Sequence, residues 1–143
     1  MEPSSFCTIC TQNCKQEIVG LLLSLSIHHP HSKIYIFSDT EIKNYIDNLT
    51  PKPKLEIMWT VNLDKYSNLN RRAMEQKGIF GNFLENKMNV MKEALEKHSD
   101  TLFIDSDTII LDKLYVDYTK EVGLSRQYIT DKYVKITGYY NAG

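Results

Sequence analysis

Short runs of apolar, β-branched and aromatic residues alternate along this chain with segments of helical periodicity. The runs occupy residues 6–11, 33–38, 55–61 and 101–104. They are apolar almost throughout instead of alternating with polar residues, which is typical of strands in a parallel sheet that is covered on both faces. The order of strands and helices therefore predicts an α/β, Rossmann-like fold, with a mainly parallel sheet and helices on both faces.

The first two helices have recognisable starts and stops. Asn13 with Gln16 fits the start of the first helix. Pro30 limits that helix, because the residue before a proline avoids helical backbone angles. Ser38 with Glu41 fits a capping box that opens a second, shorter helix.

The clearest helical signal lies in the second half of the chain. Apolar residues there step by four, four, three and four positions, which predicts an amphipathic helix: Phe80, Leu84, Met88, Met91 and Leu95. Residues 62–79 are polar and carry no clear pattern. Two short apolar runs, residues 109–111 and 122–124, are candidate strands.

The composition limits the class of protein. A length of 143 residues suits one domain, and 42% hydrophobic with 24% charged residues is ordinary globular usage. A formal net charge of -1 without a basic stripe argues against an electrostatic nucleic-acid binder. No run approaches the roughly 20 apolar residues of a membrane span, and the N-terminus lacks the basic region of a signal peptide. We therefore expect a cytoplasmic protein.

The three cysteines cluster near the N-terminus, at Cys7, Cys10 and Cys14. An odd number of cysteines is a poor disulfide framework, and a zinc or iron–sulfur site usually takes four ligands. The offset between Cys7 and Cys10 places them on opposite faces of the first strand. We therefore expect buried free thiols in a reducing compartment, and expect the histidines near Pro30 to be structural or exposed.

Polar clusters follow three of the predicted strands: Thr11-Gln12-Asn13, Asp39 and Asp105-Ser106-Asp107. Ligands of parallel sheets bind beyond the carboxyl ends of the strands, so these clusters predict a site at that edge. Asp105 and Asp107 offer hard oxygen ligands for Mn²⁺ or Mg²⁺. The alternative is that Asp105 ends the strand and Asp107 starts a turn.

Lys87 lies three residues after Leu84 and four before Met91, so it shares the apolar side of the long predicted helix. Two interpretations stay open. The lysine reaches back to a bound diphosphate, or its stem is buried and its charge lies in water.

Residues 101–114, TLFIDSDTIILDKL, resemble the metal-binding DxD segment of GT-A-fold glycosyltransferases. Residues 6–13, FCTICTQN, resemble the first strand of that fold with its nucleotide-facing turn. The segment SIHHPHSKIYIFSD resembles the end of the first helix and the second strand. Residues 139–143, YYNAG, resemble the segment that family 8-like members place near the donor sugar.

This resemblance implies a GT-A nucleotide-diphospho-sugar transferase that transfers a sugar from a nucleotide donor, with a UDP-sugar favoured. The acceptor would be a glycan, a protein or a small molecule. Asp105 and Asp107 would hold the metal, with Asp107 as the likelier direct ligand and Asp105 and Ser106 also facing the donor. The remaining donor-binding residues implied are Thr11, Asn13 and Asp39 at the base and ribose, and Asn141, Ala142 and Gly143 at the sugar. Residues 1–143 would be one nucleotide-sugar-binding domain that is incomplete at its C-terminus.

Two other functions fit parts of the pattern. A haloacid-dehalogenase-like phosphatase also has a strand followed by DxD, with Asp105 as nucleophile. Ile109 stands where that family has Thr or Val, and its motif usually lies near the N-terminus. The second alternative is a truncated, non-catalytic relative that binds nucleotide without turnover.

Overall fold

The computed structural model describes residues 1–117 and 119. Residues 2–114 form one unit, and Met1 with the residues from 115 onward belongs to a second. The candidate strand at residues 122–124 and the predicted donor-sugar residues Asn141, Ala142 and Gly143 lie outside the described residues. No helix in the described part of the chain is long and apolar enough to cross a membrane.

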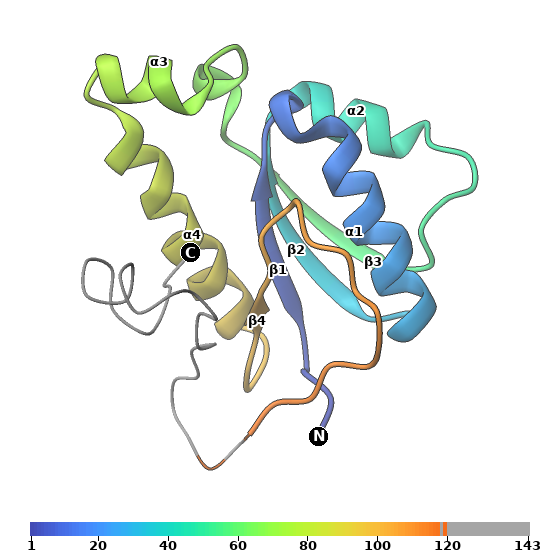
Figure 1. Cartoon of the computed structure of the whole chain (residues 1–143). Coiled ribbons are helices and arrows are strands. Elements are labelled where there is room, and N and C mark those ends of the chain that lie inside the picture. Colours follow the sequence, from blue (N-terminus) through green and yellow to red (C-terminus); the bar gives the residue numbers. More distant parts are fainter. Residues whose placement is uncertain (118, 120–143) are drawn as a thin grey trace, which may run out of the picture. The chain divides into compact units, whose positions relative to one another are not determined.

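A four-stranded, wholly parallel sheet forms the centre of the 2–114 unit (Figure 1). The strand order is β3-β2-β1-β4, with β1 at Phe6–Cys10, β2 at Lys33–Ser38, β3 at Glu56–Val61 and β4 at Leu102–Phe103. All four strands occur where the apolar runs predict them, although β4 is only two residues long. β1 pairs with β2 on one side and with β4 on the other, so it is a central strand and is buried throughout.

Helices connect the strands and cover both faces of the sheet (Figure 1). The α-helices are α1 (Lys15–His28), α2 (Thr40–Asp47), α3 (Arg71–Gln76) and α4 (Phe80–Leu95). Two single turns of 3-10 helix, η1 (Gln12–Cys14) and η2 (Asp64–Tyr66), lie after β1 and β3. The prediction of an α/β fold with a parallel sheet between helical layers is therefore confirmed.

The starts of the first two helices differ from the prediction. Asn13 does not cap α1, because η1 intervenes and Cys14 occupies the N-cap position. Asp39 caps α2 in place of the predicted Ser38, and its Oδ1 accepts a hydrogen bond from the Ile42 amide at 2.9 Å. Ser38 is still part of β2 and fully buried, so the helix can begin only after it.

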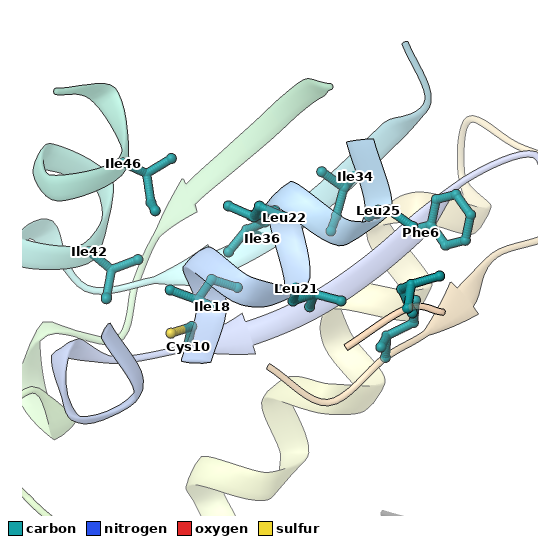
Figure 2. Close-up of a cluster of buried hydrophobic side chains, with 12 residues drawn as sticks. Phe6, Cys10, Ile18, Leu21, Leu22, Leu25, Ile34, Ile36, Ile42 and Ile46 are labelled. Atoms are coloured by element: carbon teal, nitrogen blue, oxygen red, sulfur yellow. The ribbon is translucent and has the colours of Figure 1, made fainter. Parts of the chain in front are cut away.

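Two apolar clusters pack on opposite faces of the sheet. One lies under α1 and α2 and contains Phe6 and Cys10 of β1 (Figure 2). The other lies under α4 and contains Cys7 and Ile9 of β1. The alternation of side chains along an extended strand produces this division. It confirms that Cys7 and Cys10 face opposite ways, and both are free and buried.

The buried face of α4 differs from the predicted apolar row. Val90 and Ala94 are its fully buried residues, whereas Met88 is 66% and Leu95 is 50% exposed. Lys87 lies on the inner side with only 18% of its side chain exposed. Small and β-branched residues let α4 approach β1 and β2 closely, which long side chains at those positions would prevent. Phe80 and Met91 of the predicted row pack against the apolar cluster, so the predicted face is wrong only for Met88 and Leu95.

Candidate functional site

The three predicted polar clusters meet at one edge of the sheet. Thr11 follows β1, Asp39 follows β2, and Asp105 comes two residues after β4. Because these strands are parallel and adjacent, their carboxyl ends lie together. The prediction that the three polar clusters lie at the same edge of the sheet is confirmed. The role of each side chain depends on its own contacts.

Asp39 is fully buried and joins three segments at this edge. Its Oδ2 accepts hydrogen bonds from the Gln12 amide at 2.8 Å and from the Ser67 hydroxyl at 2.6 Å. Its Oδ1 accepts the α2 capping bond from Ile42. Asp39 therefore holds the turn after β1, the start of α2 and the loop after β3 together. A direct contact with a base or ribose would require Gln12 or Ser67 to release it.

The loop between β3 and α3 closes over the turn that follows β1. The Gln12 side-chain amide donates to the Ser67 carbonyl at 3.0 Å, and the Asn13 amide donates to the Leu69 carbonyl at 2.8 Å. Thr11 is only 5% exposed, whereas Asn13 lies on the surface. Of the three residues predicted to face the base and ribose, Asn13 is thus the accessible one, because Thr11 and Asp39 are buried. No local pattern predicts this loop, because its hydrogen bonds link positions 55 and 56 residues apart.

The DxD residues form a tight turn that begins at Asp105. The Thr108 amide donates to the Asp105 carbonyl at 3.1 Å, which closes the turn. Half of the Asp105 side chain is exposed, at 47%, and Asp107 is exposed. Ser106, between them, hydrogen-bonds the Cys14 thiol at the start of α1. The turn predicted as the structural alternative is therefore present, and it leaves both carboxylates accessible.

Lys87 reaches the first carboxylate of this turn from α4. Its Nζ lies 2.9 Å from Asp105 Oδ1 and 5.3 Å from the centre of the Phe103 ring. The ammonium group is thus not in open water. This disagrees with the interpretation in which the stem of Lys87 is buried and its charge lies in water. It forms a charge-assisted hydrogen bond with a half-exposed carboxylate. A positive charge already lies where the site would hold a cation.

The oxygen ligands of the turn suit a hard divalent ion. Mg²⁺ commonly binds through one or two carboxylates and takes its other oxygens from substrate phosphates and water. Asp105 and Asp107 fit that pattern, although no group of three His, Cys, Asp or Glu side chains suited to a metal occurs among the described residues. A cation at Asp105 would compete with Lys87 for the same carboxylate.

The segment after the turn lies along α1 instead of forming the predicted strand at residues 109–111 (Figure 1). The Ile110 amide donates to the Ser24 hydroxyl at 3.0 Å. At Gly20 an added Cβ would lie 2.6 Å from Ile109 Cδ1, so the two segments are in close contact. The Ile110 amide, which would pair with a neighbouring strand in a sheet, thus donates to the side chain of Ser24 in α1.

His29 holds the far end of the same segment. Its Nε2 accepts a hydrogen bond from the Leu114 amide at 2.8 Å, which assigns the ring proton to Nδ1, facing Glu2 at 3.3 Å. His29 is 2% exposed, while His28 is half-buried and His31 exposed, as predicted for structural or surface histidines.

The contacts between α1 and this segment run in order from end to end: Ser106 with Cys14, Ile109 with Gly20, Ile110 with Ser24, and Leu114 with His29. A helix rises about 1.5 Å per residue, so these α1 positions span roughly 22 Å. An extended chain rises about 3.3 Å per residue, so residues 106–114 span roughly 26 Å. The two lengths match, and α1 therefore anchors the DxD segment along its whole length.

Comparison of this chain with protein-family models, with curated proteins and with solved structures finds no match. A fold of this class supports many activities, so function is inferred from the chemistry of the site.

Proposed function

We propose that the carboxyl edge of the sheet binds the diphosphate of a nucleotide-sugar donor together with Mn²⁺ or Mg²⁺, and that the chain is the donor-binding part of a GT-A-like glycosyltransferase. One observation carries this proposal. Two accessible carboxylates share a tight turn at the ligand-binding edge of a parallel sheet, and Lys87 lies 2.9 Å from the first of them. Carboxylates and a lysine side by side suit a ligand that brings both phosphate anions and a metal cation.

Each charged group has a distinct task in this proposal. Asp107, which is exposed, is the direct ligand of the cation. Asp105 exchanges its partner, turning from Lys87 towards the cation. Lys87 then directs its three N–H donors at the diphosphate oxygens. When bound, the metal neutralises charge that develops on the leaving diphosphate.

The groups around this turn select the rest of the donor. Asn13 is exposed at the turn after β1, where it can meet the nucleoside. Asp39, tied to Gln12 and Ser67, keeps that turn in place. The resemblance to family 8-like enzymes makes a UDP-sugar the first donor to test, and the acceptor is a glycan, a protein or a small molecule.

Calorimetry with UDP tests the proposal directly. We expect UDP to bind about tenfold more tightly or better with Mn²⁺ than with EDTA, which corresponds to about 1.4 kcal/mol. Asp107→Asn keeps the shape but removes the charge that holds the cation, so it should abolish the difference between Mn²⁺ and EDTA. Thermal stability should change little, because the side chain is exposed.

Asp112→Asn is the matched control, because Asp112 is an exposed carboxylate in the same segment. It should retain the Mn²⁺ effect in full. Equal UDP affinity in Mn²⁺ and in EDTA for the unaltered chain would refute the metal site. An aspartyl phosphate formed at Asp105 from a phosphate monoester would favour the phosphatase alternative instead.

A further inference from the structure

Cys10 and Cys14 form a pair of thiols where β1 turns into α1. Cys10 is the last residue of β1 and 1% exposed, and Cys14 is the half-buried N-cap residue of α1. The Cys10 thiol faces the Thr11 carbonyl oxygen at 3.3 Å and the Cys14 carbonyl oxygen at 3.8 Å, and its side chain interacts with that of Cys14. Figure 2 shows Cys10 under the first turn of α1, beside Ile18.

The two thiols are chemically unequal. The hydrogen bond from Cys10, helped by a second one from Ser106 and opposed by burial, lowers the pKa of Cys14 from 9.0 to about 7. The same hydrogen bond, followed by burial, raises the pKa of Cys10. The N-terminus of α1 also favours a negative charge at Cys14. One member of the pair is therefore a nucleophilic thiolate near neutral pH, and the other remains a thiol.

Cys7 does not belong to this pair. Its side chain lies in the apolar cluster on the opposite face of the sheet, and burial raises its pKa to about 12. It is an inert thiol in the same strand and therefore an internal reference.

We propose that Cys10 and Cys14 are a redox-sensitive dithiol, which a peroxide converts into an intramolecular disulfide next to Ser106 of the DxD turn. The Cys10 sulfur lies 3.8 Å from the Cys14 carbonyl oxygen, the two residues belong to two different elements, and the Cys14 side chain interacts with Ser106 of the candidate site. A low-reactivity structural pair would lack the accessible member that Cys14 provides.

The oxidation proceeds in two steps. The Cys14 thiolate attacks one oxygen of hydrogen peroxide, the O–O bond breaks, and the departing hydroxide takes up a proton to become water. Cys14 is then a sulfenic acid. The Cys10 sulfur attacks the Cys14 sulfur, the S–O bond breaks, and the leaving hydroxide takes the Cys10 proton to form a second water. The two thiols are oxidised by two electrons, and one peroxide is reduced to two waters.

The disulfide removes the thiol that Ser106 contacts. Ser106 lies between the two carboxylates of the turn, so its loss of a partner frees the turn to change shape. If the site binds nucleotide with a metal, as proposed above, oxidation weakens that binding. This consequence rests on the proposed function, whereas formation of the disulfide does not.

Mass spectrometry of the intact full chain, without alkylation, before and after treatment with hydrogen peroxide tests the dithiol. We expect a loss of about 2 Da, reversed by dithiothreitol, in the unaltered chain and equally in Cys7→Ser. The Cys7→Ser variant assigns the bridge, because one tryptic peptide ending at Lys15 carries all three cysteines. Cys14→Ser should show no loss, and Cys10→Ala should accumulate a sulfenic acid at Cys14 that dimedone traps.

Other outcomes overturn the proposal. A loss of mass that disappears in Cys7→Ser would assign the bridge elsewhere, and disulfide-linked dimers without the internal bridge would exclude it. A chain that stays fully reduced under excess peroxide would also refute it. Cys14→Ser keeps the experiment informative even if a substitution at buried Cys10 impairs folding.

The second measurement separates the dithiol from the nucleotide site. Oxidation should weaken Mn²⁺-dependent UDP binding roughly tenfold in the unaltered chain and leave Cys14→Ser unaffected. If the reduced chain does not bind UDP, the proposed function fails while the mass measurement still decides the dithiol. If reduced and oxidised chains bind UDP equally, the link between the dithiol and the DxD turn is refuted.

Discussion

Ser24→Ala separates the anchoring of the DxD segment from the general stability of α1. Ser24 is 9% exposed, and its hydroxyl accepts from the Ile110 amide at 3.0 Å and donates to the Leu21 carbonyl at 3.0 Å. Alanine keeps the helix and removes only the hydroxyl. The Ile110 amide then loses its partner, in a position where Ile110 itself is buried.

The expected cost follows from two opposing terms. A buried donor left without an acceptor costs about 1–3 kcal/mol. Alanine improves helix propensity over serine by about 0.5 kcal/mol. The free energy of unfolding should therefore fall by about 0.5–2.5 kcal/mol, a noticeable fraction of the roughly 5–15 kcal/mol typical of a domain.

Ser26→Ala is the matched control on the same helix. The Ser26 hydroxyl donates to the Leu22 carbonyl at 2.7 Å and holds no amide from the DxD segment. Its removal should leave stability unchanged or raise it by up to about 0.5 kcal/mol. Urea unfolding of both variants measures this difference.

Hydrogen exchange gives the decisive readout for Ser24→Ala. The Ile110 amide should exchange roughly tenfold faster or more, since 1.4 kcal/mol corresponds to a factor of ten. Amides in the middle of α1 should follow only the change in global stability. Equal unfolding energies for the two variants, with unchanged protection of Ile110, would refute the anchoring of the DxD segment by α1.

Three further predictions concern the charged and ionisable groups. Lys87→Met keeps the aliphatic packing and frees Asp105, so Mn²⁺ alone should bind about threefold to tenfold more tightly and UDP more weakly. Weaker Mn²⁺ binding in calorimetry would contradict the competition of Lys87 with the cation for the Asp105 carboxylate. Asp39→Asn places an N–H group against the donors of Gln12 and Ser67, so the free energy of unfolding in urea should fall by about 2–4 kcal/mol. An unchanged urea midpoint would show that Asp39 does not hold these segments together. Folding lowers the Cys14 pKa from 9.0 to about 7, so the thiolate contributes stability that is fully present above pH 9 and is lost as the pH falls through 7. Iodoacetamide should accordingly modify native Cys14 with a rate that rises through pH 7, while Cys7 stays unmodified; a midpoint near 9 for Cys14 would argue against the shift.

The sheet and its helical layers were predictable from the sequence because burial on both faces leaves an unmistakable pattern. Residues 34–37 form an unbroken apolar run, and Pro30 ends the preceding helix within two residues of its actual end at His28. The carboxyl-edge position of Asp39 and Asp105 followed from parallel topology alone. These features depend on local sequence and on one rule of chain direction.

Other features depend on contacts between residues far apart in the sequence and could not be predicted from local patterns. The contact face of α4 was predicted only in part: Met88 and Leu95 are exposed, and Val90 and Ala94 are the fully buried residues of the helix. Residues 109–111 were expected to pair as a strand, but Ser24 takes the Ile110 amide. Periodicity records how apolar a surface is, and it does not record which neighbour covers it.

The contacts at this edge divide into fixed and exchangeable ones, and that division supports a binding site over a merely structural turn. The buried groups are committed: Asp39 to three donors, and Ser24 and His29 to amides of the DxD segment. Among the described residues, Lys87 pairs with Asp105, and the side chain of Asp107 is exposed. Exposed carboxylates and their surface ion pairs add little to the stability of a fold. A preorganised site for a metal and a diphosphate instead requires buried groups that are fixed before the ligand arrives. It also requires charged groups that can change partners at low cost.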